Sequence, residues 1–307
     1  MAFPPRLIAL AGPTASGKSA LAMRLARARH AEIVSCDSLQ VYRGLDVGSA
    51  KPGLADRAAV PHHLIDVVDP DQDFSAADYG RMARLAIASI HARGRAAIVA
   101  GGTGLYLRAL LHGLFAGPAR DESIRRRLEA IADRRGDPRL HRLLARVDPE
   151  SAARIEPRDR VRVVRALEVY RATGKSIGEH HRAAEESRAG FEWRVLVLDP
   201  GRDTLRAAIE KRTDAMLAGG LVEETRGLLE RYPGARPLGA IGYRQASAVV
   251  HGAQDVEQAR HDIVLATMRY AKRQRTWFRH QETANWFADA GQAEEAASRW
   301  LDGGNFL

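Results

Sequence analysis

The sequence predicts an α/β fold in which a parallel sheet is flanked by helices and a helical domain is inserted. Two observations carry this prediction. Short apolar runs alternate with helical patterns over the first third of the 307 residues, which is typical of βαβ units. Near residue 116 the sequence becomes helical and Arg-rich, and a clear strand resumes at 193–199. We therefore expect residues 1–115 and 191–307 to form one discontinuous core, with a helical insertion at 116–190.

The apolar runs place the strands of the core. Residues 6–11 predict a buried strand, followed by a Gly-rich loop and a helix over about 18–30. Further buried strands are expected at 31–37 and 96–102, and residues 62–69 form another strand or an edge. Because strands alternate with helices, we expect helices on both faces of the sheet.

Helices account for the rest of the core. Residues 75–94 have a Ser at the N-terminal cap position, apolar residues at helical spacing and a closing Gly. Beyond the strand at 193–199, the pattern predicts helices at 203–218 and 221–232, a Gly-rich turn at 237–245 and a long basic helix over about 256–283.

Composition and charge limit the classes of function. The formal net charge of +9 and the isoelectric point of about 10.1 favour a polyanionic partner. The single cysteine, Cys36, excludes a disulfide framework and a cysteine-based zinc site, and it fits a reducing compartment. No apolar run approaches about 18 residues, so neither a membrane segment nor a signal peptide is expected. We expect a cytoplasmic protein and, since no pattern indicates association, a monomer.

The stretch GPTASGKS matches the phosphate-loop pattern G-x-x-x-x-G-K-[ST] at every fixed position. It lies between a buried strand and a helix start, so loop amides and the helix N-terminus face an anion. Lys18 adds a charge, and the Ser19 hydroxyl is a ligand for Mg²⁺. The core is therefore predicted to be P-loop NTPase-like, although the motif leaves open whether ATP itself binds. A diphosphate or triphosphate is expected to contact Gly12, Pro13, Thr14, Ala15, Ser16, Gly17, Lys18 and Ser19.

A second candidate site is EIVSCDSLQVYRG, residues 32–44, where a strand ends at Asp37. The residues alone leave three roles open for this carboxylate: general base, Mg²⁺ ligand, or cap of a following helix. The strand at 96–102 leads to Thr103 and carries no acid at its end. Phosphoryl transfer usually needs a second metal-holding acid. The sequence therefore disfavours an ordinary NTPase and leaves Asp37 as the nearest candidate carboxylate.

Six blocks together resemble the bacterial tRNA dimethylallyltransferases, also called tRNA isopentenyltransferases, of the IPP transferase family. In chain order they are GPTASGKS, DSLQVYRGLDVGSAKP, PHHLIDVVDP, VAGGTGLYLRALLHGL, RVVRALEVYRATGKS and MRYAKRQRTWFR. The resemblance implies transfer of a dimethylallyl group from dimethylallyl diphosphate, with Mg²⁺, to the exocyclic amine of the adenosine 3′ of the anticodon. The tRNAs are those that read codons beginning with U. The bacterial pattern also implies that no zinc is bound.

The resemblance implies roles for individual residues. Asp37 becomes a general base for the adenine amine, with the metal-ligand role still open. Thr103 contacts the leaving-group oxygen, while Lys18 and Arg212 stabilise the diphosphate. Gln40 offers a donor and an acceptor to an adenine edge, and the insertion holds the anticodon stem-loop. The implied tRNA contacts are Asp37, Ser38, Leu39, Gln40, Arg162, Arg165, Ile241, Gly242, Tyr243, Arg244 and Gln245.

Two basic helices support RNA as the partner. Arg158, Arg162 and Arg165 are spaced to share a helix face. The apolar positions expected to face a core are Val161, Val164, Leu167 and Val169. The last long helix interleaves basic and aromatic residues, which suits phosphate contact and base stacking. These residues are Arg269, Tyr270, Lys272, Arg273, Arg275, Trp277, Phe278 and Arg279.

Three other functions fit parts of the sequence. A P-loop small-molecule kinase would use Asp37 to activate a hydroxyl. A prenyltransferase acting on free adenine nucleotides would share the chemistry but would not need the basic helical lobe. The intact phosphate loop and Asp37 argue against a non-catalytic RNA-binding module.

Overall fold

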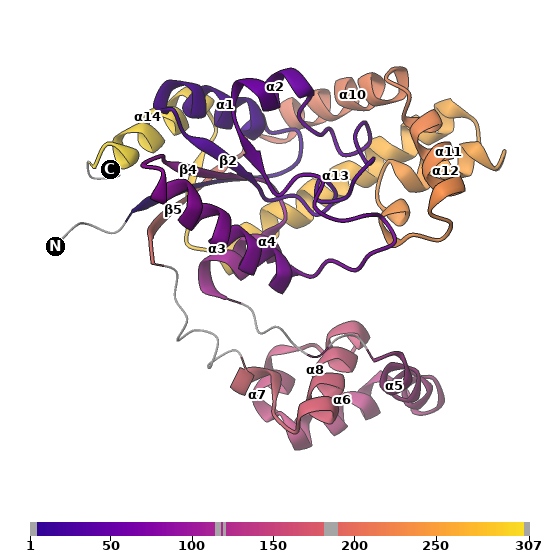
Figure 1. Cartoon of the computed structure of the whole chain (residues 1–307). Coiled ribbons are helices and arrows are strands. Elements are labelled where there is room, and N and C mark those ends of the chain that lie inside the picture. Colours follow the sequence, from indigo (N-terminus) through magenta and orange to yellow (C-terminus); the bar gives the residue numbers. More distant parts are fainter. Residues whose placement is uncertain (1–4, 114–117, 119–120, 181–189, 304–307) are drawn as a thin grey trace. The chain divides into compact units, whose positions relative to one another are not determined.

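The computed structural model describes residues 5–113, 118, 121–180 and 190–303. The chain divides into two compact units (Figure 1). We call residues 1–111 with 189–307 the core, and residues 112–188 the insertion. Among the described helices, none is both long enough and apolar enough to cross a bilayer.

The described part of the core forms a six-stranded sheet in the order β3-β2-β4-β1-β5-β6. Every neighbouring pair is parallel, which confirms the predicted α/β class. The 62–69 segment contributes only an edge strand, and the last strand, three residues long, was not predicted. The strands are β1 (Arg6–Ala11), β2 (Glu32–Ser35), β3 (His62–His63), β4 (Ala97–Ala100), β5 (Glu192–Leu198) and β6 (Asn285–Phe287).

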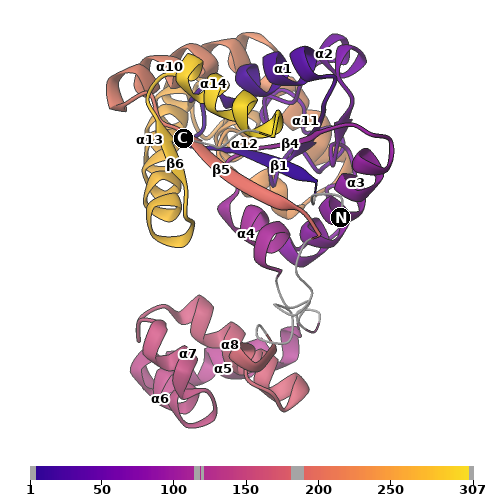
Figure 2. The same ribbon diagram turned by 90° about the vertical axis from the view of Figure 1, so that its left-hand side faces the viewer.

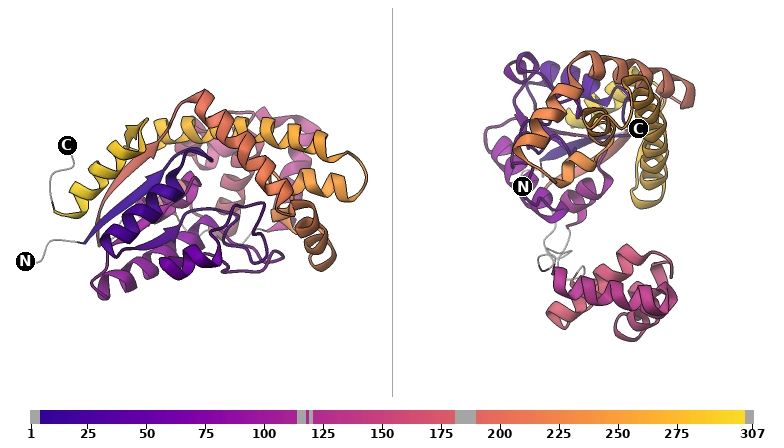
Figure 3. Two further views of the ribbon diagram at one scale, coloured as in Figure 1. Left: turned by 90° about the horizontal axis from the view of Figure 1, so that it is seen from above. Right: turned by 90° about the vertical axis from the view of Figure 1, so that its right-hand side faces the viewer.

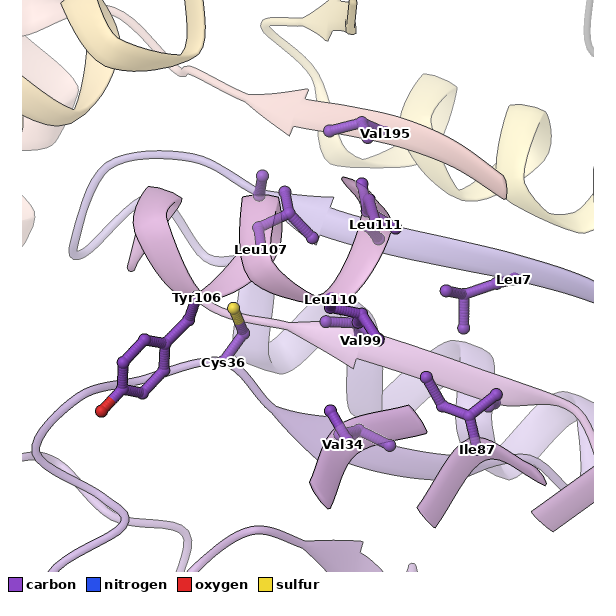
Figure 4. Close-up of a cluster of buried hydrophobic side chains, with 14 of the residues drawn as sticks. Leu7, Val34, Cys36, Ile87, Val99, Tyr106, Leu107, Leu110, Leu111 and Val195 are labelled. Atoms are coloured by element: carbon purple, nitrogen blue, oxygen red, sulfur yellow. The ribbon is translucent and has the colours of Figure 1, made fainter. Parts of the chain in front are cut away.

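Helices cover both faces of this sheet (Figure 2). Helices α3 (Ala76–Ala92) and α4 (Gly104–His112) pack on one face, and α1 (Lys18–Arg29) and α14 (Ala290–Leu301) pack on the other. Successive β1 residues point to opposite faces, yet all of those from Leu7 onward are buried. In Figure 4, α4 side chains such as Leu107 and Leu110 lie over Val99 of β4.

The predicted cap of α3 is confirmed. Ser75 Oγ accepts a hydrogen bond from the Asp78 amide at 3.1 Å, and Asp78 Oδ2 accepts one from the Ser75 amide at 3.2 Å. This reciprocal pair satisfies two amides at the helix start that would otherwise lack partners.

Further helices pack around the sheet and beyond its carboxyl edge (Figure 3). One correction concerns the Gly-rich turn predicted at 237–245: a helix begins at Tyr243, because Gln245 Oε1 accepts the Gly242 amide at 3.0 Å and caps it. The further helices of the core are α2 (Leu54–Ala59), α10 (Arg202–Ala218), α11 (Leu221–Arg231), the 3₁₀ helix η1 (Arg236–Gly239), α12 (Tyr243–Val250) and α13 (Val256–Gln281).

The described part of the insertion contains α5 (Glu122–Arg135), α6 (Asp137–Val147), α7 (Pro149–Arg154) and α8 (Arg160–Thr173) around its own apolar cluster. Val163 and Val164 enter this cluster, whereas Val161 is 71% exposed. The expectation that Val161 faces a core was therefore wrong, because Val163 and Val164, not Val161, lie on the buried side of α8.

Candidate active site

Three strand ends meet at one edge of the sheet. β1 leads into the phosphate loop, β2 leads to Asp37, and β4 leads to Thr103. In the sheet β4 lies between β2 and β1, so Thr103 follows the strand between the other two. β1 continues into α1 on one face and β4 into α4 on the other. Divergence of this kind at adjacent parallel strands opens a crevice at their carboxyl ends.

The exits of β2 and β4 are joined directly. Thr103 Oγ1 accepts the Ser38 amide at 3.1 Å, and the Thr103 amide donates to Cys36 O at 3.2 Å. A Cβ at Gly101 would lie 2.0 Å from Cys36 O, so only glycine permits this approach. Ser38 and Thr103 are thus held together within the candidate site.

Helix α13 joins the phosphate loop to the loop that follows β4. Gln274 is buried; its Oε1 accepts the Thr14 amide at 2.9 Å and its Nε2 donates to Gly102 O at 2.8 Å. Tyr270, about one turn earlier, lies close to the Thr103 side chain. The sequence pattern did not indicate a role for Gln274 and indicated only base stacking for Tyr270. The available signal was a polar amide within the buried helical stripe 267, 271, 274 and 278.

Asp37 uses one carboxylate oxygen as a cap. Its Oδ1 accepts the amides of Leu39 at 2.8 Å and of Gln40 at 3.4 Å. This arrangement closes the turn after β2. Within the described residues, Oδ2 makes no hydrogen bond or ion pair. The capping role and a chemical role are therefore compatible, because they use different oxygens.

Lys18, Arg212 and Asp37 form a charged cluster. Burial lowers the pKa of Lys18 from 10.5 to about 8; Asp37 opposes this shift and Arg212 reinforces it. Burial also lowers the pKa of Arg212, which lies on α10, and Asp37 again opposes the shift. Two cations that have lost part of their hydration share one carboxylate here, so an anionic ligand would stabilise their positive charge. The structure thus brings Lys18, Arg212, Asp37 and Thr103 to one site.

A profile of the IPP transferase family matches residues 40–281 of this chain. The chain belongs to the IPP transferase family.

Individual relatives agree over nearly the full length. The chain is 51% identical to a tRNA dimethylallyltransferase of Anaeromyxobacter dehalogenans strain 2CP-C, over 96% of this chain and 98% of that protein. It is 49% identical to the Myxococcus xanthus tRNA dimethylallyltransferase, over 94% of each chain.

Solved structures of the family share the fold. A tRNA isopentenylpyrophosphate transferase of Bacillus halodurans is 36% identical with a TM-score of 0.68, covering 97% of this chain and 96% of that one. A eukaryotic dimethylallyltransferase acting on tRNA is 25% identical with a TM-score of 0.78, covering 98% of this chain and 80% of that one.

For this IPP transferase, the structure divides the residues expected to contact tRNA. Ser35 Oγ donates to Gln40 Oε1 at 2.9 Å, and Gln40 Nε2 contacts the carbonyls of Ser49 and Ala50, each at 3.3 Å. Leu39 packs against the apolar cluster that contains Leu45 and Tyr243. Both ends of the Gln40 amide are engaged, so pairing with an adenine edge would require these bonds to break.

The 241–245 segment is largely buried. Tyr243 is fully buried and Gln245 is 7% exposed, with its amide capping α12. Contact of these two side chains with tRNA does not fit the structure, because each is buried and already makes a hydrogen bond within the protein. Ile241 packs partly against the same apolar cluster, whereas the Arg244 side chain is exposed. Of the side chains predicted here, Arg244 is the one presented to solvent.

The two arginines of α8 also differ. Arg165 donates to the fully buried Glu168 at 2.9 Å and to Pro118 O at 3.2 Å. Arg162 is 71% exposed and makes one surface ion pair, with Asp159 at 3.2 Å. Removing the cation from a buried carboxylate costs far more stability than breaking an exposed ion pair. Arg162 is therefore available to RNA, and Arg165 has a structural task.

The basic helix α13 shows a similar division. Phe278 is buried, so base stacking on it does not fit the structure, whereas Trp277 is only partly buried against the main core cluster. The cations instead line a groove beside the start of α10. Its cationic lining consists of Arg202, Arg269, Lys272, Arg275 and Arg279.

Proposed function

We propose that this IPP transferase moves a dimethylallyl group from dimethylallyl diphosphate to the exocyclic amine of the adenosine 3′ of the anticodon, in tRNAs that read codons beginning with U. The observation that carries the proposal is the sheet edge itself: a phosphate loop, the unengaged oxygen of Asp37 and the Thr103 hydroxyl, with no acid at the end of β4. Relatives named tRNA dimethylallyltransferase support it.

In the proposed reaction, the bond between the allylic carbon and the diphosphate oxygen breaks, and the adenine nitrogen bonds to that carbon. The amine proton passes to Asp37 Oδ2 and then to solvent, and diphosphate leaves with the bonding electrons. Lys18, Arg212 and the loop amides stabilise the charge that grows on the leaving group. In this proposal Thr103 contacts the leaving-group oxygen.

Mg²⁺ is proposed as the cofactor. Among the described residues, no group of three or more His, Cys, Asp or Glu side chains could hold a metal ion. A Mg²⁺ ion here would therefore be held by hydroxyl oxygens of the protein. Phosphate oxygens and water would complete its ligand set, since Mg²⁺ prefers oxygen ligands. Ser19 is exposed in the first turn of α1, and in the preceding loop the buried Ser16 Oγ has no hydrogen-bond partner among the residues that the structure describes. These hydroxyls fit a bound metal diphosphate, whose charge Mg²⁺ would help to neutralise.

The direct test combines the purified protein, unmodified tRNA, Mg²⁺ and dimethylallyl diphosphate labelled in the prenyl group. We expect label in tRNA, at the adenosine 3′ of the anticodon. Parallel reactions offer AMP as the acceptor, or ATP with small hydroxyl compounds. Transfer to AMP but not to tRNA, or phosphorylation by ATP without prenyl transfer, would overturn the proposal.

Donor capture should weaken as pH rises through about 8. Lys18 is cationic below its pKa of about 8 and neutral above it, so its attraction for the diphosphate is present at lower pH and lost at higher pH. The measurement is kcat/KM for dimethylallyl diphosphate on both sides of pH 8. A Lys18→Arg variant, which stays charged, should give a flatter alkaline limb. An alkaline limb of the same shape in both proteins would assign it to another group.

We also propose that the insertion binds the anticodon stem-loop. Arg162→Ala should weaken tRNA binding and lower the slope of log affinity against log salt by about one, as expected for one lost phosphate contact. Filter binding over a range of salt concentrations measures both. Arg154→Ala is the matched control, because Arg154 is also exposed and makes one surface ion pair within the insertion. An unchanged slope for Arg162→Ala would place this residue away from the RNA.

A further inference from the structure

Glu224 of α11 is clamped onto the backbone of the loop that follows the Asp37 turn. Its Oε2 accepts the amides of Asp46 at 3.1 Å and Val47 at 2.8 Å, and its Oε1 accepts the Gly48 amide at 3.2 Å. The Tyr243 hydroxyl donates to Oε1 at 2.7 Å. A carboxylate that accepts three consecutive amides fixes the local path of the chain more firmly than a neutral acceptor would.

Packing reinforces these hydrogen bonds. Tyr243 is fully buried, and a Cβ at Gly48 would lie 2.5 Å from its ring, so the loop backbone rests directly on the aromatic side chain. Burial and the adjacent Glu224 both raise the pKa of Tyr243, which keeps its hydroxyl protonated as a donor. The clamp thus consists of Glu224, Tyr243 and the backbone of residues 46–48.

The clamped loop leads back to Asp37 through Gln40. The Gln40 amide donates to the carbonyls of Ser49 and Ala50, immediately after the clamped residues. The Gln40 backbone amide in turn donates to Asp37 Oδ1. Hydrogen bonds and short stretches of covalent chain therefore alternate along a path from α11 and α12 to the carboxylate, although Glu224 does not touch the proposed reacting atoms.

We propose that Glu224 and Tyr243 are positioning residues that set the orientation of Asp37 for proton removal from the acceptor amine. This inference rests on the proposed function. It also gives the buried Tyr243 side chain of the 241–245 segment a task that contact with tRNA does not supply. Small displacements of a reacting group are costly in rate, since a misplacement of about 1 Å can reduce it about 100-fold.

The test compares Glu224→Gln and Tyr243→Phe with Glu223→Gln, a matched control because Glu223 is its exposed neighbour on α11. Single-turnover prenyl transfer is measured at saturating tRNA, together with tRNA affinity and thermal unfolding. We expect the Glu224→Gln rate to fall about 10- to 100-fold and that of Tyr243→Phe to fall in the same direction, with tRNA affinity and the KM for the donor little changed. The control should match the unsubstituted protein.

A double variant separates positioning from general damage. If Glu224 acts through Asp37, adding Glu224→Gln to Asp37→Asn should cause little further loss of rate. A second loss of the full size, or unimpaired rates in both single variants, would overturn the proposal. Tyr243→Phe, which keeps the buried ring, carries the same test if Glu224→Gln does not fold. Absence of prenyl transfer by the unsubstituted protein would instead refute the proposed function itself.

Discussion

Replacing Asp37 with asparagine is expected to reduce the rate of prenyl transfer by about 10²–10⁴-fold, the usual contribution of a general base. The asparagine side-chain oxygen can still accept the amides of Leu39 and Gln40, so the turn after β2 is kept. What is lost is the proton acceptor at Oδ2. Single-turnover transfer to tRNA measures the effect, and tRNA affinity should stay nearly unchanged.

Asp37→Ala provides the comparison, because alanine removes both the cap and the base. If Asp37 served only as a cap, the asparagine variant would keep most of its activity and the alanine variant would lose it. A large loss of tRNA affinity in Asp37→Asn would also contradict the base role and indicate a binding role. A Mg²⁺-ligand role would appear as a raised Mg²⁺ requirement that added metal restores.

Replacing Lys18 with alanine is expected to lower kcat/KM for dimethylallyl diphosphate by about 10²–10³-fold, the typical effect of removing one preorganised donor to a developing anion. Lys18 is the first residue of α1 and interacts with Arg212 and Asp37, where partial exclusion of water strengthens its interaction with phosphate. Steady-state kinetics with varied donor, at saturating tRNA, provide the measurement.

Lys211→Ala is the matched control for Lys18, because Lys211 is an exposed cation on α10, adjacent in sequence to Arg212. It should leave the donor kinetics unchanged. Asp37 supports the positive charge of Lys18, and this charge faces the diphosphate. The loss of activity in Lys18→Ala should therefore be in donor capture and in the chemical step, with tRNA affinity unaffected. Equal losses in both lysine variants would indicate a general effect of net charge.

Local patterns were sufficient where neighbouring residues determine the structure. The phosphate-loop motif could be recognised because its fixed residues are contiguous, and the strand at 6–11 could be recognised because both of its faces are apolar. The capping box of α3 involves residues only three apart. By contrast, β6 was not predicted because it is only three residues long. The start of α12 was read as a turn because glycines precede it.

The candidate site itself depends on contacts between distant segments. The sequence by itself determined the phosphate loop, the placement of Asp37 and Thr103 at strand ends, and the βαβ class. Only the tertiary structure decided that β4 lies between β2 and β1, which brings those strand ends together. It also decided that Gln274 joins two loops, that Arg165 serves Glu168, and that Tyr243 is buried. The physical reason is that exposure and partner choice arise from packing between segments far apart in the chain, which a local pattern of polar residues does not encode.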